Sequence, residues 1–346
     1  MKKHRDRAII RVVIATGISS VVIQLLTIRE FLTQFQGNEI VIALILFNWL
    51  ILGGLGTQLA RTVGCRHKAT AERLAWLSLI LAALAMLQIL ALRRLRDIIF
   101  IQGSSVGFYP TWLFSFLIIA PYCLLLGFVL PYSLFVLRAD TADYPGARIY
   151  ITDNIGDIAG GVLFSFVLVY LVNPLTAIFL AHLPLLAATY LLFAPSRRKR
   201  SGVILANASV AVFLAGSILL EMPSLAPPEG SLVYYRETRY GRIAVHRDRE
   251  QLTLFEDGVP VFSSQNLSSA EETIHYPLSQ LDEIQHVLLI SAEGGVMAEL
   301  KKYRIESVDY VELDPAVAAV QFRFDLIRKI DGLHVVHQDA RAYLSH

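Results

Sequence analysis

Two glycines and two acids near the carboxyl end of the chain have types and spacings that suit ligand chemistry. Gly294 and Gly295 follow a short apolar run at 287–290 and precede a helical pattern. Glycines at that place let a negatively charged group approach the backbone, where helix amides and the helix dipole favour it. Glu312 ends a second apolar run 22 residues after the first, where an acid can accept hydrogen bonds from ribose hydroxyls. Asp339 follows a third run, in a position suited to an adenine amino group.

Together these residues predict a nucleoside-binding site. The glycine turn alone is a weak signal because it lacks the full G-x-G-x-x-G pattern, and the alternative for Glu312 is a surface carboxylate at a strand end. The two cysteines form no metal-binding pattern, so no metal site is expected. The chain has 31 basic and 29 acidic residues and no basic stripe, which excludes nucleic acid as a partner.

A second constellation lies at 150–161, at the start of an apolar stretch. Asp153 and Asp157 are four residues apart and therefore share one face of a helix. Gly156 and Gly160 form a small-xxx-small pair that allows another helix to approach closely. The segment is thus either a packing motif with an interfacial cap or a transport or ligand site.

The elements around the nucleoside residues follow an alternating order. Strands are expected at 287–290, 307–313 and 333–337, with helices between them, which is the order of the first half of a doubly wound sheet. Ser268 and Glu271 predict a capping box at the start of a preceding helix. A small β-module comes earlier, with strands at 242–246, 251–255 and 259–262 and a hairpin turn at Asp257–Gly258.

The first part of the chain has the composition of a membrane protein. Hydrophobic residues make up 55% and charged residues 17% of the sequence, and a spanning helix needs about 20 mostly apolar residues. Seven stretches qualify, of which the last is the least apolar: 8–28, 40–60, 74–92, 112–137, 155–172, 175–194 and 202–220. We therefore expect an α-helical transmembrane bundle followed by an α/β segment. The predicted parts are a six- or seven-helix membrane domain at 1–221, a linker at 222–231, the β-module at 232–267 and a partial Rossmann-like nucleoside-binding domain at 268–346.

From about Val233 onward the chain resembles the spermidine synthases, which are polyamine aminopropyltransferases. The matching segments are 240–243, 254–258, 270–278, 287–296, 311–315 (Val-Glu-Leu-Asp-Pro, the most specific) and 339–343. The membrane half is similar to the multi-span region carried by a bacterial branch of that family, through Tyr150 and the glycines of 150–161.

This resemblance implies a transfer of an aminopropyl group from decarboxylated S-adenosylmethionine to a polyamine, with methylthioadenosine as product and no prosthetic group. It implies that Glu312 binds ribose, that Asp339 and Ala340 contact adenine, and that Glu293 stands where the family has the aspartate of its glycine-rich turn. At the family's diamine positions the chain departs from the pattern, with Val261 for a glutamine, Ser269 for a tyrosine and Ala270 for a histidine.

The family's catalytic aspartate lies on a strand beyond His346, so the catalytic residue of this chain is unknown. We expect either a truncated Rossmann-like sheet or a protein that has lost the reaction, since the attacking amine must give up a proton. The alternatives are a membrane transporter or sensor with a nucleoside-binding domain and no catalysis, and an AdoMet-dependent methyltransferase. The expected partners are the lipid bilayer, nucleoside and polyamine ligands and, as an open option, a second copy of the chain.

Loop charges and ligand supply disagree about the orientation in the membrane. With a cytoplasmic N-terminus, fourteen basic residues lie inside and four (Arg29, Arg93, Arg94 and Arg96) lie outside. Seven spans then place the C-terminal segment outside, whereas decarboxylated S-adenosylmethionine is a cytosolic compound. We expect a bacterial inner-membrane protein with a cytosolic C-terminal domain, in which 202–220 lies along the interface and six helices span.

Overall fold

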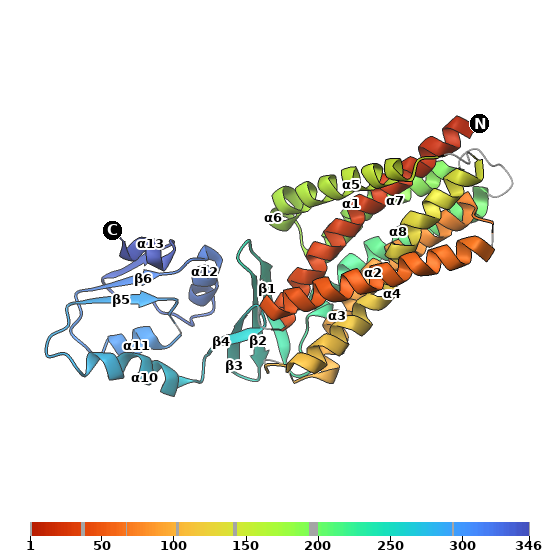
Figure 1. Cartoon of the computed structure of the whole chain (residues 1–346). Helices are drawn as coiled ribbons and strands as arrows, with labels where there is room; N and C mark the ends of the chain where they lie inside the picture. Colours follow the sequence, from red (N-terminus) through yellow and green to blue (C-terminus); the bar gives the residue numbers. More distant parts are fainter. Residues whose placement is uncertain are drawn as a thin grey trace. The chain divides into compact units, whose positions relative to one another are not determined.

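The computed structural model describes residues 2–35, 39–66, 68–101, 104–140, 144–193, 200–292 and 294–345. It forms two compact units, Met1–Ala226 and Pro227–His346, shown in Figure 1. The division falls inside the expected linker at 222–231. Each unit is described by itself.

The N-terminal unit consists of long helices. They are α1 (Lys2–Gln34), α2 (Glu39–Arg66), α3 (Ala71–Ile99), α4 (Phe108–Asp140), α5 (Gly146–Leu163) with its extension through α6 (Val169–Leu171), α7 (Pro174–Phe193), α8 (Arg200–Ser217) and α9 (Glu221–Ser224). Among the described residues, seven helical stretches are long and apolar enough to cross a membrane. The unit therefore has the composition and helix lengths of a multi-pass membrane protein.

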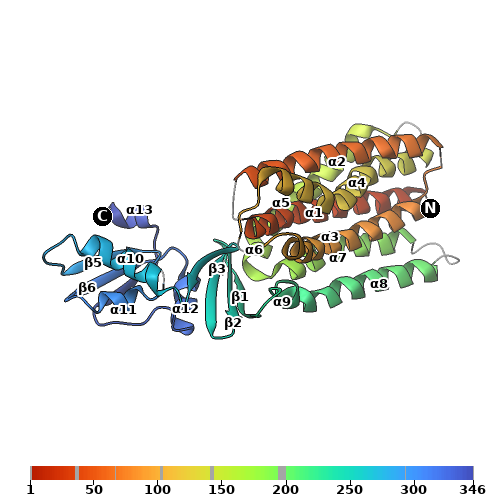
Figure 2. The ribbon, with the colours of Figure 1, turned by 90° about the horizontal axis from the view of Figure 1, so that it is seen from below.

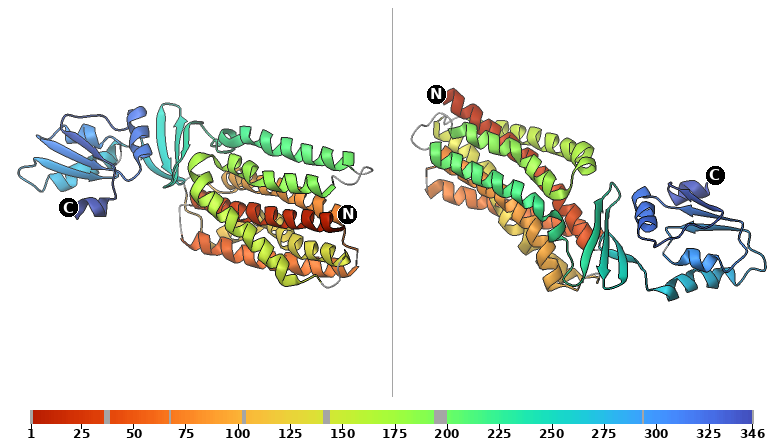
Figure 3. Two further views of the ribbon diagram at one scale, coloured as in Figure 1. Left: turned by 90° about the horizontal axis from the view of Figure 1, so that it is seen from above. Right: turned by 180° about the vertical axis from the view of Figure 1, so that it is seen from behind.

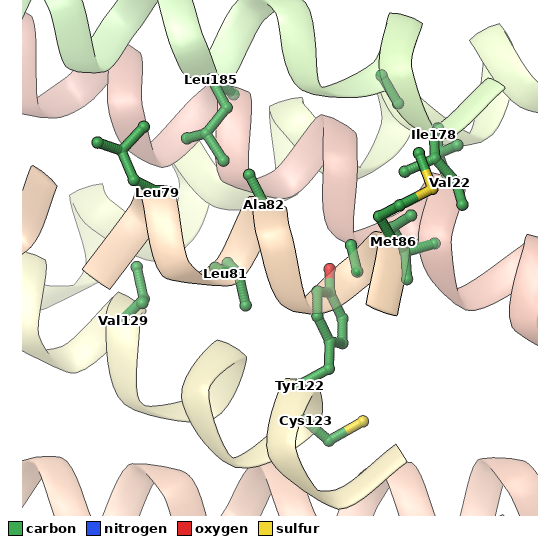
Figure 4. Close-up of a cluster of buried hydrophobic side chains, with 14 of the residues drawn as sticks. Val22, Leu79, Leu81, Ala82, Met86, Tyr122, Cys123, Val129, Ile178 and Leu185 are labelled. Atoms are coloured by element: carbon green, nitrogen blue, oxygen red, sulfur yellow. The ribbon is translucent and has the colours of Figure 1, made fainter. Parts of the chain in front are cut away.

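Apolar side chains occupy both the interior and the outer surface of this unit. Val22, Met86, Tyr122 and Ile178 come from four different helices and meet in the buried core shown in Figure 4. Large apolar side chains also cover the outside, as with Leu50 at 76% exposure. A soluble protein rarely exposes so much contiguous apolar surface, whereas lipid tails match it.

The stretch 202–220, which was expected to lie along the interface, forms most of helix α8, and its position in a membrane stays a prediction. The stretch Ser201–Ser224 has a mean hydropathy of 2.3, above the 1.7 of Gly146–Leu171, so it is not the least apolar span. The Thr189 hydroxyl of α7 donates to Asn207 Oδ1 of α8 at 2.8 Å, and Leu175 N at the start of α7 donates to Glu221 Oε2 at 2.8 Å. Helix α8 thus runs antiparallel along the length of α7 (Figure 2). Asn207, one of the polar residues that dilute α8, thus hydrogen-bonds α7, and the stretch is long and apolar enough to cross a membrane.

A buried ion network joins three parts of the N-terminal unit. Arg93 of α3 is 1% exposed, and its guanidinium donates to Glu30 Oε1 at 2.6 Å and to Glu221 Oε1 at 2.8 Å. The same guanidinium donates to Ser224 Oγ at 2.8 Å. The charge count assigned Arg93 to an outer loop, whereas the structure places it in α3 with its side chain buried. Two carboxylates and a hydroxyl compensate the cost of burying this cation.

Glycines hold two pairs of helices at very short separation. A Cβ atom on Gly156 of α5 would lie 2.3 Å from Ile14 O of α1, and one on Gly160 would lie 2.4 Å from Ile18 O. A Cβ atom on Gly127 of α4 would lie 2.1 Å from Gly53 O of α2. The packing role predicted for Gly156 and Gly160 is confirmed.

The first part of the C-terminal unit is a four-stranded antiparallel sheet, whose ribbon is drawn in Figure 3. Its strand order is β1-β2-β3-β4. Its strands are β1 (Ser231–Glu237), β2 (Arg242–Asp248), β3 (Gln251–Glu256) and β4 (Val259–Ser263). Strand β1 was not predicted. The hairpin turn at Asp257–Gly258 was, and both residues have positive φ, of 47° and 75°, as a two-residue type I′ turn requires.

The second part is a parallel sheet in the order β5-β6-β7 with helices between the strands. Its elements are α10 (Leu267–Leu278), β5 (His286–Ile290), α11 (Val296–Leu300), β6 (Ser307–Val311), α12 (Pro315–Arg323), β7 (Leu333–Val336) and α13 (Ala340–Leu344). The predicted order of strands and helices is confirmed. The capping box is wrong, because α10 starts after Asn266 without a side-chain cap and Ser268 lies inside the helix.

Candidate nucleoside-binding site

The three parallel strands bring the predicted ligand residues to one edge of the sheet. Ile290, Val311 and Val336, the last residues of β5, β6 and β7, are paired in register. Ser291 N donates to Val311 O at 3.0 Å, and Glu312 N donates to Val336 O at 2.9 Å. The glycine turn, Glu312 and the segment leading to Asp339 therefore all start from the carboxyl edge, where open α/β sheets bind ligands.

The turn after β5 has the backbone conformation expected of a close-approach turn. Gly295 has a φ of 83° and Ser291 one of 48°, and glycine adopts positive φ at no steric cost. A Cβ atom on Gly294 would lie 2.2 Å from the Phe262 ring, so that ring of β4 covers the turn. Glu293 lies outside the described residues.

Glu312 is buried at the end of β6, with an exposure of 6%. Its Oε1 accepts from Asp314 N at 3.2 Å, and its Oε2 lies 3.1 Å from the Tyr310 hydroxyl. A carboxylate offers about four lone-pair positions, so two remain for a ligand. Asp314 is the N-cap of α12, with Oδ1 accepting from Ala316 N at 2.9 Å, and the Asp314–Pro315 start of α12 fixes the backbone next to Glu312.

Gln321 of α12 links the strand end to the glycine turn. The Tyr310 hydroxyl lies 2.8 Å from Gln321 Oε1, closer than it lies to Glu312, and it has only one hydrogen to donate. Gln321 Nε2 donates to Ala292 O at 3.1 Å. Sequence reasoning missed Tyr310 and Gln321, because neither stands at a strand end or in a motif.

Four acids gather beside this edge, and one of them is unusual. Burial, followed by the charges of Glu312, Asp257 and Asp314, raises the pKa of Glu256 from 4.5 to about 7. Asp257 Oδ1 accepts from Arg242 N at 2.8 Å and Asp314 Oδ2 accepts from the Thr238 hydroxyl at 2.6 Å, whereas no hydrogen bond reaches the Glu256 carboxyl from the described residues. Alternation in β3 could have identified it, since Glu256 shares a strand face with buried Leu254.

Asp339 is exposed and acts as the N-cap of α13. Its Oδ1 accepts from Arg341 N at 2.8 Å and from Ala342 N at 3.2 Å. Ala340 is the first residue of that helix. A structural role therefore accounts for one Asp339 oxygen, and the exposed position leaves the carboxylate accessible to a ligand.

The glycine turn borders a cavity that Glu312 and Asp339 do not line. A cavity of about 340 Å³ borders Gly294 and Gly295, but its other lining residues come from β4, α10, α11 and the segment after α12, and Glu312 and Asp339 are not among them. Ala270 is 1% exposed, and its side chain lies 3.2 Å from a Cβ atom placed on Gly295. In the part of the chain that the structure describes, no group of His, Cys, Asp and Glu is arranged to hold a metal ion.

Comparisons with known proteins point to one family of transferases. No family model matches the chain. It is 25% identical over 185 residues to polyamine aminopropyltransferase 2 of Aquifex aeolicus, a match that covers 52% of this chain and 38% of the relative. It is 27% identical over 182 residues to polyamine aminopropyltransferase of Oceanobacillus iheyensis, with 49% and 36% covered. It is 30% identical over 122 residues to the Mycobacterium tuberculosis protein of that name, with 33% and 23% covered.

The chain thus spans less than two fifths of the length of these relatives. The two longest matches exceed the C-terminal unit, Pro227–His346, and so include residues of the N-terminal unit. These partial similarities at low identity suggest the polyamine aminopropyltransferase family.

Proposed function

We propose that the chain belongs to a membrane-anchored, spermidine synthase-like protein whose C-terminal unit binds the nucleoside part of decarboxylated S-adenosylmethionine. The observation that carries this proposal is the carboxyl edge of β5-β6-β7, where a glycine turn and the buried carboxylate of Glu312 follow adjacent strands. The distant relatives named polyamine aminopropyltransferase support it.

In this proposal Glu312 accepts hydrogen bonds from the ribose hydroxyls, Asp339 and Ala340 contact adenine, and Gly294 and Gly295 give the ligand access to the backbone. The reaction forms a C–N bond between the acceptor amine and the aminopropyl group and breaks the C–S bond of the sulfonium, which leaves as methylthioadenosine. The attacking amine loses a proton, and that proton requires an acceptor.

A membrane sensor or transporter that binds the nucleoside without catalysis is the second candidate. The observation that favours it is the apolar or small character of Val261, Ser269 and Ala270, which stand at the family's diamine positions. Incubation of the full-length product of the gene with decarboxylated S-adenosylmethionine and putrescine separates the two candidates. Release of methylthioadenosine supports the enzyme, and binding without release supports the sensor. Preference for S-adenosylmethionine over its decarboxylated form would instead indicate a methyltransferase.

Calorimetric titration of the full chain with methylthioadenosine tests the site itself. Replacement of a charged acceptor by a neutral one costs about 1.5–3 kcal/mol, so Glu312→Gln is expected to weaken binding about 10- to 100-fold. Glu306→Gln is the matched control, because Glu306 is exposed and precedes the same strand. Equal dissociation constants for Glu312→Gln and the unmodified chain would exclude Glu312 from the site.

The proposal also places the C-terminal unit in the cytosol of a bacterium, where the aminopropyl donor is made. With seven crossings this placement puts the N-terminus outside, against the distribution of loop charges. Alkaline phosphatase fused after Ser231 decides the matter, because this reporter folds only where its disulfides form. An inactive fusion supports the cytosolic unit, and strong phosphatase activity removes the cytosolic donor from the proposal.

A further inference from the structure

The N-terminal unit contains a cavity of about 300 Å³ between two glycine-packed helix pairs. Its walls come from α1, α5, α2 and α4, and it is lined by Thr16, Ser20, Val21, Gln24, Trp49, Gly53, Thr57, Leu126, Gly127, Leu130, Pro131, Tyr150, Asp153 and Asp157. This volume is at the lower end of the range of small-molecule sites. Most of the polar lining groups lie on α1 and α5, and most of the apolar side chains lie on α2 and α4.

Both carboxylates of the 150–161 segment border this cavity, and no residue in its lining is basic. The Ser20 hydroxyl lies 3.4 Å from Asp157 Oδ1, but it lies 2.9 Å from Gly17 O and has one hydrogen to donate. Among the described residues, no donor hydrogen-bonds to Asp153. Carboxylates inside a membrane-spanning helix are costly unless a cation or several donors compensate them.

Thr16 provides independent evidence that the cavity takes a ligand. Its side chain lines the cavity and is 4% exposed, and its hydroxyl has no hydrogen-bond partner among the described residues. A buried threonine in a helix ordinarily donates to a carbonyl one turn earlier, as the Thr111 hydroxyl does to Gly107 O at 2.9 Å. An unpaired buried hydroxyl costs about 1–3 kcal/mol, so its persistence points to a partner in the cavity.

We propose that this cavity binds a small organic cation that carries a primary ammonium group. An ammonium has three donors and no acceptor, which complements two carboxylates and the oxygen of Thr16. The alkyl part of the ligand has matching surface in Val21 and Leu130, and the Trp49 ring can contact the cation through its face. A bare metal ion would need a shell of six or more oxygens at about 2–2.6 Å and would leave the apolar wall and most of the volume unused.

The site goes beyond the proposed function, because it lies in the membrane unit and uses none of the nucleoside residues. The glycines explain how α5 presents its carboxylates. Gly156 lies between Asp153 and Asp157 in sequence and packs against the α1 backbone near Thr16, so both acids face the helix that carries the unpaired hydroxyl. The packing and ligand interpretations of 150–161 therefore hold together rather than exclude each other.

Binding of radiolabelled putrescine to the full chain in lipid nanodiscs tests the proposal. Asp153→Asn is expected to weaken binding about tenfold or more, as for loss of a charged hydrogen-bond partner. Thr16→Val is expected to weaken it several-fold without loss of thermal stability, because the hydroxyl has no partner to lose in the empty protein. Thr33→Val is the control, since Thr33 is equally buried on α1 and its hydroxyl donates to Glu30 O at 2.9 Å, away from the cavity.

The nucleoside site provides the second control. Glu312→Gln is expected to leave the Asp153-dependent putrescine binding unchanged, so failure of the nucleoside proposal does not affect this one. If Asp153→Asn does not fold, the Thr16→Val result decides. Putrescine binding that is equal in Thr16→Val, Asp153→Asn and the unmodified chain overturns the proposal. Displacement of putrescine by sodium chloride but not by choline chloride at equal ionic strength also overturns it, in favour of an inorganic cation site.

Discussion

The raised pKa of Glu256 predicts that stability of the C-terminal unit decreases as pH increases through a defined window. In the unfolded chain this carboxyl titrates near 4.5, and in the folded unit its pKa is about 7. The folded state therefore holds the proton more tightly, and its stability is highest where Glu256 is protonated in both states. Between pH 4.5 and 7 the folded state must either keep a proton or accept a charge beside Glu312, Asp257 and Asp314. Glu256→Gln removes that penalty.

The size of the effect follows from the shift. One pKa unit corresponds to about 1.4 kcal/mol, so the full shift sets an upper limit of about 3.4 kcal/mol. Glu256 is only partly buried, and solvent screening reduces the expected gain to about 1–2 kcal/mol at pH 8. Near pH 4.5 the gain is expected to vanish, because the glutamic acid is then neutral in both states. The stability advantage of the variant therefore grows between pH 4.5 and 7 and is complete above pH 7.

Hydrogen exchange measured by mass spectrometry on the full chain isolates this unit. Peptides from β3, β4 and β6 report on its opening, and variant and unmodified protein are compared at the same pH so that intrinsic exchange rates cancel. A gain of about 1–2 kcal/mol corresponds to exchange that is about 5- to 30-fold slower in Glu256→Gln at pH 8. Glu250→Gln, in the exposed turn between β2 and β3, is the matched control and is expected to change nothing.

The reasoning fails if the ratio of exchange rates between variant and unmodified protein is the same at pH 5 and pH 8. It also fails if Glu256→Gln exchanges faster at pH 8, because the carboxylate would then be making a favourable interaction with a cation. A gain that appears equally in Glu250→Gln would instead assign the effect to net charge.

Three further predictions concern packing and burial. Arg93→Met is expected to destabilise the N-terminal unit by about 3–5 kcal/mol, because the carboxylates of Glu30 and Glu221 then remain buried without a cation. Thermal unfolding followed by tryptophan fluorescence measures the change, and an unchanged midpoint contradicts the prediction. Gly156→Ala is expected to lower the same midpoint by forcing α1 and α5 apart, whereas Gly202→Ala, with nothing within 4 Å of the added methyl, is expected to leave it unchanged or higher. Phe262→Ala is expected to cost about 3–5 kcal/mol and to speed exchange in the glycine turn.

Local signals predicted the elements that depend on local chemistry. Asp257–Gly258 specified its turn, because few other dipeptides accept two positive φ values. Asp314 and Pro315 are residue types typical of a helix start, and α12 begins there with the Asp314 carboxylate accepting from Ala316 N. The helix after the glycine turn ends at Leu300. Beyond it, the backbone amides of Lys302 and Tyr303 donate to the third residue before them, which tightens the last turn.

Features that depend on distant contacts could not be read from the sequence. Its polar residues make α8 look like a weak span in the sequence, whereas in the structure Asn207 accepts a hydrogen bond from the Thr189 hydroxyl of α7. Phe262 and Gly294 are far apart in sequence, so no local pattern predicts that the Phe262 ring covers the glycine turn. Glu312 was predicted as a ligand residue from its place after a strand; its contacts with Tyr310 and Asp314 are local, but its burial was not predicted.

The glycine contacts of the membrane unit also bear on selectivity. Gly17, Gly56 and Gly127 place backbone against backbone on two sides of the cavity, with added Cβ atoms meeting neighbouring atoms at 2.7, 2.1 and 2.1 Å. At Gly53 and Gly127 the lining is main chain without rotamers, so this part of the wall loses its conformational entropy on folding and not on ligand entry. We expect this part of the wall to limit the chain length of the ligand, because each methylene beyond the available space meets a fixed surface. A series of diamines that differ by one carbon is then expected to show a sharp optimum.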